Sequence, residues 1–293
     1  MAFYMKKIIV TGCNGQLGRA INRAYSGESD YELINTDFGI EGIQNLDISD
    51  IDGVMAFVSG IKPYAIINCA AMTAVDLCET KQDMAYRINA IGPRNLAIAA
   101  SATDAKLIHV STDYVFRGDG SVPYTEFDPV GPVSMYGKTK LAGEEFVRQM
   151  TGRAFIVRTA WLYGDGKNFV KTMLRLSENH DEVTVVDDQI GSPTSAAELA
   201  AAIKSLIPSD NYGLFHGTCE GRCSWADFTE EIFRLAGKTT KVKHVSSADY
   251  KAMNPDSADR PKFSVLENYM FKLTGGYQFA EWQDAIADYL REM

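Results

Sequence analysis

The sequence predicts an α/β protein in which a doubly wound parallel sheet is joined to a smaller, interleaved C-terminal lobe. Three observations lead to this fold class. Short β-branched apolar runs alternate with stretches of helical periodicity, a glycine-rich turn directly follows the first run, and the regular alternation ends near Ala160. Alternating strands and helices are typical of parallel sheets with right-handed crossovers.

Each expected strand is a short apolar run, such as KKIIVT at 6–11, and runs of this kind suit strands buried on both faces. The stretches between them place apolar residues at helical spacing. Expected strands span residues 6–11, 31–36, 65–69, 106–110 and 154–159, and expected helices span 16–26, 51–59, 83–102 and 136–150. Together these elements predict the doubly wound sheet.

The pattern after residue 160 is less regular and indicates a second unit. A chain of 293 residues is long enough for roughly two domains. Expected helices at 169–177, 196–206, 225–235 and 282–290 are interrupted by loops that contain glycine and proline. We therefore expect one domain at 1–160 and a smaller lobe at 161–293, from which residues of about 183–207 return to the first domain.

Charge and composition exclude several classes of protein. The chain has 29 Lys and Arg residues and 38 Asp and Glu residues. The resulting net charge of −9 repels nucleic acid. No apolar run approaches the ~18 residues of a membrane span, and the N-terminus lacks a signal peptide's apolar core, so we expect a cytoplasmic protein. Five cysteines without C-x-x-C pairs predict reduced thiols, and four scattered histidines do not support a metal site.

The glycine-rich turn GCNGQLG predicts a dinucleotide site. Gly12 permits the tight turn, Gly15 lets the backbone approach a pyrophosphate, and Gly18 allows the helix to pack closely on the strand. The N–H groups at the helix start then face the anion. A glycine triplet alone is weak evidence, but its position between strand and helix favours dinucleotide binding over an ordinary turn. We therefore expect a Rossmann domain first and a mainly substrate-binding lobe after it.

Asp37 closes the second expected strand, where a carboxylate can accept hydrogen bonds from the hydroxyls of an adenosine ribose. The same charge repels a 2′-phosphate and so favours NADH over NADPH. Arg19, directly after the glycine turn, could instead reach such a phosphate. The alternative for Asp37 is a turn aspartate with no ligand. Both NADPH and NADH therefore stay open as cofactors.

Three further residues form a candidate catalytic set. Tyr136 and Lys140 share one face of an expected helix at i and i+4, and Thr112 follows the fourth expected strand. We expect the Lys140 ammonium, together with a positive nicotinamide ring, to lower the pKa of the Tyr136 phenol, because nearby positive charge favours phenolate. Tyr136 and Lys140 alone would be more typical of a solvated helix face. With a hydroxyl at the carboxyl end of a strand, the set can act on a carbonyl that receives a hydride.

Residues 68–71 (NCAA) end the third expected strand with small side chains, which let backbone approach a cofactor. Tight packing at a strand end is an equally good interpretation. Asn89, in the long expected helix, suits a packing or backbone-bonding amide better than a proton relay.

These motifs together resemble the extended short-chain dehydrogenase/reductase superfamily. Further blocks, spread over nearly the whole chain, are similar to dTDP-4-dehydrorhamnose reductases. The blocks are GCNGQLG at 12–18, NCAAMTAVD at 68–76, STDYVF at 111–116, YGKTK at 136–140, RTAWLYG at 158–164, Asn168-Phe169, VDDQIGSPT at 186–194, and Arg260-Pro261 with Ser264. Each block alone is unspecific, and the combination is specific.

The resemblance implies NAD(P)H-dependent reduction of the 4-keto group of dTDP-4-dehydro-L-rhamnose (dTDP-6-deoxy-L-lyxo-4-hexulose) to dTDP-L-rhamnose. By matching position it implies that Thr112, Tyr136 and Lys140 are catalytic, with Tyr136 protonating the new C4 oxygen. The implied cofactor-binding residues are Gly12, Asn14, Gly15, Gln16, Leu17, Gly18, Asp37, Asp47, Ile48, Cys69, Ala70, Ala71, Thr73, Tyr136 and Lys140. The implied substrate-binding residues are Asp113, Tyr114, Val115, Trp161, Asn168 and Arg260, whose guanidinium suits a diphosphate.

Some features depart from this pattern or leave it open. Phe38 stands where many relatives carry a basic residue, which weakens the case for NADPH, and Met72 replaces an aromatic residue. Trp161 could equally be a core residue, and Arg260 could form a surface salt bridge. Some relatives use Mg²⁺ at a dimer interface; Glu292 lies in about the right region, but we assign no metal to it, and a homodimer stays open.

Two other functions compete with this interpretation. One is a reductase or epimerase of another nucleotide-linked deoxysugar, because pocket shape decides the sugar. The other is a non-catalytic regulatory subunit like that of methionine adenosyltransferase, which has the same fold. The retention of Thr112, Tyr136 and Lys140 speaks against the regulatory subunit, because a binding module has no chemical need for all three.

Overall fold

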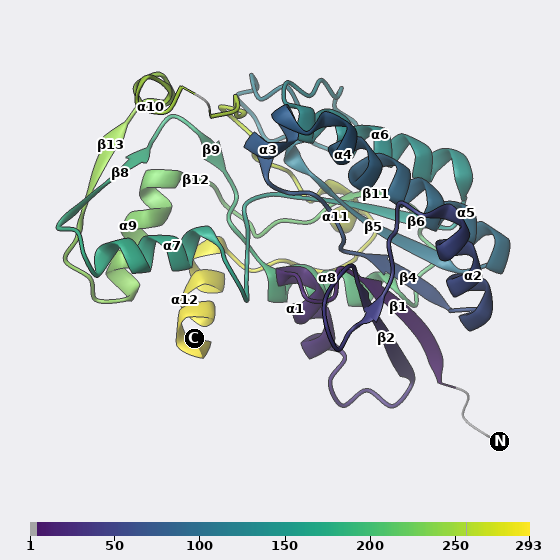
Figure 1. Cartoon of the computed structure of the whole chain (residues 1–293). Coiled ribbons are helices and arrows are strands. Elements are labelled where there is room, and N and C mark those ends of the chain that lie inside the picture. The colour runs from purple at the N-terminus through teal and green to yellow at the C-terminus, as the bar shows by residue number, and fades with distance from the viewer. Residues whose placement is uncertain (1–4, 256) are drawn as a thin grey trace.

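The computed structural model describes residues 5–255 and 257–293, and within them its larger lobe is built on a seven-stranded parallel sheet of order β11-β6-β5-β4-β1-β2-β3 (Figure 1). The strands are β1 (Lys6–Thr11), β2 (Tyr31–Asp37), β3 (Gln44–Asn45), β4 (Ala65–Asn68), β5 (Lys106–Thr112), β6 (Ala154–Thr159) and β11 (Gly213–His216). This order and direction confirm the predicted doubly wound sheet.

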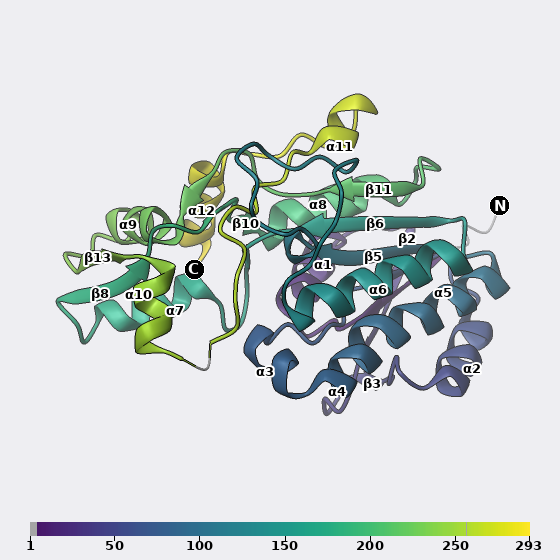
Figure 2. The same ribbon diagram turned by 90° about the horizontal axis from the view of Figure 1, so that it is seen from above.

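Helices cover both faces of the sheet, and α5 and α6 run side by side along one of them (Figure 2). They are α1 (Gln16–Ala24), α2 (Ile51–Ile61), α5 (Gly92–Thr103), α6 (Met135–Met150) and α8 (Ala196–Leu206). Ile8 and Val10 pack into a cluster with α1 and α8, whereas Ile9 packs into a second cluster with α2 and α5. The strands are buried on both faces because successive side chains alternate between these two clusters.

The smaller lobe is built around a two-stranded parallel sheet, at the left of Figure 1. Its main elements are β8 (Glu182–Val186), β13 (Lys241–Val245), α7 (Phe169–Ser177), α9 (Trp225–Leu235), α10 (Ser247–Met253) and α12 (Trp282–Glu292). Short strands occur in pairs, β7 (Leu162–Tyr163) with β10 (Thr194–Ser195) and β9 (Ile190–Gly191) with β12 (Cys223–Ser224). Tyr163, Phe228 and Trp282 belong to its apolar cluster.

The two lobes interleave more than the sequence indicates. Of the stretch 183–207, α8 packs against the sheet through Leu199 and Ile203, but β8 pairs with β13 in the smaller lobe. The chain also returns to add β11 beside β6, and α11 (Tyr269–Leu273) packs on β11. Neither β11 nor α11 was predicted, because four or five residues carry too little periodicity to be recognised.

The expected helix at 83–102 is interrupted. The structure has α3 (Val75–Thr80), α4 (Gln82–Tyr86), a π-helical turn η1 (Arg87–Ile91) and then α5. Within η1, the Asn89 amide accepts from the Met72 N–H at 2.8 Å and donates to the Met72 carbonyl oxygen at 3.0 Å. The π-helical turn therefore places the Asn89 side chain where it can bond to the backbone of Met72. Bonding to backbone is the role expected for Asn89. Among the described residues no helix combines the length and apolarity needed to cross a bilayer.

Candidate active site

The glycine-rich turn lies between β1 and α1, and its glycines are required by close backbone contacts. Gly12 has φ +64°, and a Cβ on it would lie 2.7 Å from the Ala70 nitrogen. A Cβ on Gly18 would lie 2.4 Å from the Gly12 carbonyl oxygen. Gly15 is the N-cap of α1 and provides no side-chain cap, so the first N–H groups of the helix keep their capacity for an anion. The turn therefore fits the pyrophosphate of a dinucleotide.

Asp37 ends β2 beside this turn. Its carboxylate accepts hydrogen bonds from the Asn14 N–H at 3.0 Å and the Phe38 N–H at 2.9 Å. Arg19 also contacts Asn14 and donates to its carbonyl oxygen at 2.8 Å and its side-chain oxygen at 2.7 Å. A carboxylate and a guanidinium therefore both contact Asn14 of the glycine turn.

A cavity of about 350 Å³ opens at the carboxyl ends of β1, β4, β5 and β6. Many of the residues predicted from the sequence line it: Gly12, Gly15, Gln16, Leu17, Gly18, Cys69, Ala71, Thr73, Thr112, Asp113, Tyr114, Tyr136, Lys140 and Trp161. The structure thus brings the glycine turn and the candidate catalytic set into one cavity, as the position of ligands in doubly wound sheets predicts.

The three candidate catalytic residues come from two elements. Thr112 is the last residue of β5; its hydroxyl donates to Asp113 Oδ1 at 2.9 Å and accepts from the Tyr114 N–H at 3.2 Å. Tyr136 and Lys140 lie one turn apart on α6, and the Tyr136 ring meets the Tyr114 ring edge-on at 5.4 Å. The Lys140 ammonium is buried and donates to the Val110 carbonyl oxygen at 2.6 Å.

In the protein without a bound cofactor, the pKa of Tyr136 is raised. Burial raises the pKa of the phenol, and the hydrogen bond with Thr112 lowers it only partly. Desolvation is the largest cause of this shift, and the lowering predicted for the Lys140 ammonium together with a bound nicotinamide stays a prediction. A protonated phenol at neutral pH suits a proton donor.

Burial acts on Lys140 in the opposite direction. Desolvation lowers the pKa of the Lys140 ammonium to about 8, and the nearby Glu144 carboxylate raises it in part. Lys140 therefore changes its charge within a few pH units of neutrality.

Asp113 and Tyr114 extend the cavity toward the smaller lobe. Burial raises the pKa of Asp113 to about 6, and the hydroxyls of the nearby Ser264 and Thr112 lower it in part. Among the described residues, Asp113 Oδ2 is buried without a hydrogen-bond partner. An unpartnered carboxylate oxygen of this kind can accept a hydrogen bond from a ligand hydroxyl.

Other predicted residues lie outside the cavity lining. Val115 packs in an apolar cluster with Phe116 and Leu266. Asp47 accepts hydrogen bonds from the Ser49 N–H and hydroxyl, and the side chain of Ile48 is buried.

Two predicted substrate contacts also have local partners. Asn168 is the N-cap of α7; it accepts from the Lys171 N–H and donates to the Tyr289 hydroxyl. Arg260 forms an ion pair with Asp76 at 3.4 Å and lines a separate cavity of about 300 Å³.

Trp225 lines the cavity but was not predicted from the sequence. Trp161, with φ +47°, stacks on Trp225 at 3.5 Å between ring centroids and an interplanar angle of 5°. A left-handed conformation is unusual for a tryptophan. The pair joins the end of the larger lobe to α9, so Trp161 is a cavity residue and a packing residue at once. Nothing in the sequence around Trp225 indicates this stacking.

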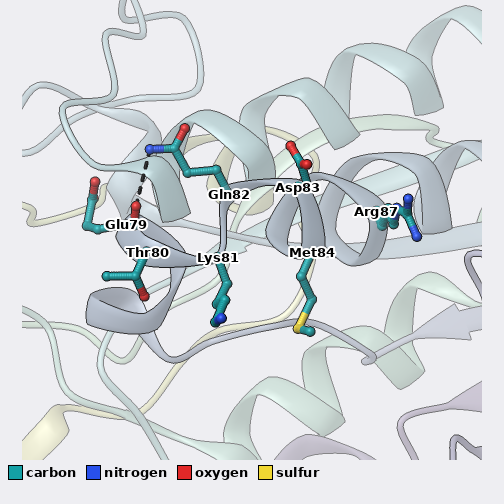
Figure 3. Close-up of a pocket in the computed structure, with 7 residues that line it drawn as sticks. All are labelled: Glu79, Thr80, Lys81, Gln82, Asp83, Met84 and Arg87. Carbon is teal, nitrogen blue, oxygen red and sulfur yellow. Dashed lines mark hydrogen bonds between the residues drawn. The ribbon is translucent and has the colours of Figure 1, made fainter.

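A second hollow lies on the surface between α3 and α4 (Figure 3). It is lined by Glu79, Thr80, Lys81, Gln82, Asp83, Met84 and Arg87, and Gln82 donates to the Glu79 carbonyl oxygen at 3.2 Å. None of these residues belongs to the candidate catalytic or cofactor-binding set.

Metal binding gains no support from the structure. In residues 5–255 and 257–293, no group of three or more His, Cys, Asp or Glu side chains could hold a metal ion. A role for Mg²⁺, which the sequence left open without an assigned site, is therefore not supported. All five cysteines are free, and burial raises the pKa of Cys69 to about 12.

The fold and the cavity together define the class of protein. A pyrophosphate cradle of glycines opens into the same cavity as a buried phenol, an ammonium and a hydroxyl. Hydride transfer from a nicotinamide to a carbonyl needs these groups, since the cofactor must be held and the oxygen protonated. The protein is an NAD(P)-dependent oxidoreductase with a Rossmann fold.

Comparison with known proteins identifies the family. The chain belongs to the family described as "RmlD substrate binding domain", whose model matches residues 5–293. A dTDP-4-dehydrorhamnose reductase structure from Clostridium acetobutylicum is 51% identical, with a TM-score of 0.93 and coverage of 98% of this chain and 100% of that chain. A dTDP-4-dehydrorhamnose reductase from Bacillus anthracis in complex with NADP is 41% identical, with a TM-score of 0.93 and coverage of 99% and 100%.

A relative with a different name is also similar over its whole length. A spore coat polysaccharide biosynthesis protein of Bacillus subtilis is 39% identical over 289 residues, which are 98% of each chain. The similarity to relatives therefore includes both lobes and does not stop at the cofactor-binding part.

Proposed function

We propose that this chain catalyses NAD(P)H-dependent reduction of the 4-keto group of dTDP-4-dehydro-L-rhamnose to dTDP-L-rhamnose. The observation that carries the proposal is the convergence of Thr112, Tyr136 and Lys140 beside the glycine turn. The similarity to dTDP-4-dehydrorhamnose reductases along both lobes supports the choice of substrate.

Thr112, Tyr136 and Lys140 each have a separate role in the proposed reduction. The Thr112 hydroxyl orients the C4 carbonyl, and the Tyr136 phenol gives its proton to the carbonyl oxygen. The Lys140 ammonium holds the nicotinamide ribose and stabilises the phenolate that Tyr136 becomes. When bound, the reduced nicotinamide supplies the hydride that C4 receives. The phenolate then regains its proton from solvent.

The nucleotide end of the substrate would extend toward the smaller lobe. The separate cavity of about 300 Å³ that Arg260 lines shares Trp225 with the catalytic cavity. It is also lined by Phe169 and Tyr250. Aromatic side chains suit the nucleobase and the guanidinium suits the diphosphate. Arg260 would exchange its long contact with Asp76 for phosphate oxygens. Asp113 Oδ2 would accept from a sugar hydroxyl.

We also propose that both NADH and NADPH are used. Asp37 favours ribose hydroxyls, and Arg19 offers a guanidinium to a 2′-phosphate. Asp37→Ala should therefore weaken the affinity for NADH about tenfold, which is the effect of losing a hydrogen bond to a charged group. The affinity for NADPH should fall less. Fluorescence titration of both cofactors measures this, with Asp30→Ala, at the opposite end of β2, as control. Equal losses for the two cofactors would remove Asp37 as the ribose anchor.

Turnover should depend on pH through Lys140. Burial lowers the pKa of Lys140 to about 8 and raises the pKa of Tyr136, so both groups are protonated at neutral pH and Lys140 loses its proton first as pH rises. We therefore expect kcat/KM to be constant around neutrality and to fall above about pH 8. A steady-state profile at constant ionic strength tests this. A flat profile through pH 10 would contradict a need for the charged ammonium.

The substrate is tested by mixing the chain with dTDP-4-dehydro-6-deoxy-glucose and NADH or NADPH, with and without the 3,5-epimerase that supplies the lyxo-hexulose. Epimerase-dependent oxidation that yields dTDP-rhamnose is the expected result. Oxidation without the epimerase would instead indicate a reductase of another deoxysugar. Tight cofactor binding without oxidation in either mixture would favour a regulatory subunit.

The cytoplasmic location and the homodimer stay predictions from the sequence. Light scattering of the purified chain tests the homodimer directly, and twice the chain mass of 32.3 kDa is the result expected for it.

A further inference from the structure

Glu144 is a fully buried carboxylate on α6, the helix that also carries Tyr136 and Lys140. Its Oε1 accepts from the Ser111 hydroxyl at 2.6 Å and from Arg158 Nε at 2.8 Å. Its Oε2 accepts from Arg158 Nη2 at 2.8 Å and from Arg148 Nη2 at 3.0 Å. The buried donors that hold the carboxylate thus come from β5 and β6, and Arg148 adds a half-exposed contact from α6.

These bonds connect the two parts of the candidate catalytic set. Ser111 directly precedes Thr112 on β5, and Arg158 on β6 is the register partner of Ser111. Glu144 therefore attaches the helix of Tyr136 and Lys140 to the strand end of Thr112. The contact between the Lys140 ammonium and the Val110 carbonyl oxygen is a second attachment between the same two elements.

Stability alone is a weak reason for a buried ion pair at this place. Replacing such a pair by well-packed apolar side chains is often neutral or stabilising, because two charges must be desolvated. Glu144 and Arg158 are both almost fully buried. A geometric role beside the reacting groups explains their position better.

We propose that Glu144 is a positioning residue, which holds Thr112 through Ser111 at a fixed distance from Tyr136 and Lys140. The proposal rests on the reduction proposed above. A displacement of about 1 Å between a catalytic group and the reacting atoms can reduce turnover on the order of 100-fold.

Glu144 also contributes charge near Lys140. The titratable groups around the ammonium are Glu144 and Tyr136 from α6, Cys69 after β4 and His109 on β5. Burial raises the pKa of Cys69 to about 12 and lowers the pKa of His109, so both are neutral near pH 7. Glu144 is then the nearby negative charge that raises the pKa of Lys140 in part against desolvation.

Two variants and a control test the proposal. Ser111→Ala removes one bond and keeps the buried ion pair, so it tests geometry in a chain expected to fold. Glu144→Gln keeps the size of the side chain and removes its charge. Arg148→Ala is the matched control, because it removes the half-exposed partner of the same carboxylate and leaves the buried bonds intact.

We expect kcat to fall about tenfold in Ser111→Ala and more in Glu144→Gln, with KM for the sugar nucleotide within about twofold of wild type. In Glu144→Gln, but not in Ser111→Ala, the decline of kcat/KM at high pH should move to lower pH. Arg148→Ala should keep the wild-type kcat and pH profile.

The proposal is overturned if folded Ser111→Ala keeps wild-type kcat, or if Arg148→Ala loses as much as the two other variants. If the Glu144→Gln variant does not fold, the kcat of Ser111→Ala alone decides the test. Failure of the proposed function gives a different result, since wild type itself would not reduce the dTDP-sugar. The pH dependence of NADPH affinity in wild type and Glu144→Gln can then still be compared by fluorescence, and identical profiles would overturn the charge effect.

Discussion

Tyr136→Phe is expected to lower kcat by about two to four orders of magnitude while the dissociation constant of NADPH changes little. The substitution removes the phenolic proton and leaves the ring, so the packing against Tyr114 is kept. Because burial raises the pKa of Tyr136, the wild-type phenol carries its proton throughout the neutral range, and the variant lacks this proton. Steady-state kinetics with a saturating cofactor measure the loss.

Tyr269→Phe is the matched control for this variant. Tyr269 is exposed on α11 and does not line the catalytic cavity, so the same chemical change should leave kcat at the wild-type value. Near-normal turnover of Tyr136→Phe, with the control unchanged, would remove Tyr136 from the mechanism.

Gly137→Ala should be the second most damaging of these substitutions. A Cβ at Gly137 would lie 2.2 Å from the Tyr114 carbonyl oxygen and 2.9 Å from Pro132 Cβ. The first turn of α6 would have to move away from the strand end, and Tyr136 would move with it. We expect kcat to fall on the order of 100-fold and the free energy of unfolding to fall by about 1–3 kcal/mol.

Gly60→Ala separates the effect of this clash from the effect of helix propensity. Gly60 is also helical, in α2, but a Cβ there has open space around it. Alanine is the better helix former, so Gly60→Ala should change stability by zero to about +1 kcal/mol and leave kcat unchanged. Thermal unfolding and kinetics of both variants provide the comparison. Wild-type kcat and stability in Gly137→Ala would show that the contact with Tyr114 does not restrict the helix.

The larger lobe could be predicted because its signals are local. The apolar runs of β1 and β4 are buried on both faces, and the glycine turn needs only the strand before it and the helix after it. Tyr136 and Lys140 lie one helical turn apart in the sequence and in the structure. Their meeting with Thr112 follows from the rule that ligands bind at the carboxyl ends of parallel strands.

The remaining features depend on contacts between distant parts of the chain. The stacking of Trp161 on Trp225 joins two elements that share no sequence pattern. The direction of the pKa shift of Tyr136 depends on how completely the fold buries the phenol, which the i, i+4 spacing does not reveal. The π turn at Asn89 interrupts a helix whose apolar pattern continues through it. In the sequence alone, Glu144 is typical of a surface residue of a helix. Only the fold brings Arg158 and Ser111 into contact with its carboxylate.

The return of α8 and β11 to the larger lobe has a consequence for how the protein can be divided. A fragment that ends near residue 160 would uncover the face of the sheet that α8 packs on and leave β6 as an unpaired edge, which is a typical origin of aggregation. An exchange of C-terminal halves between relatives would transfer α8 and β11 of the larger lobe along with the smaller lobe. The two lobes are therefore not separable modules, and substitution of individual cavity residues is the change that leaves both of them intact.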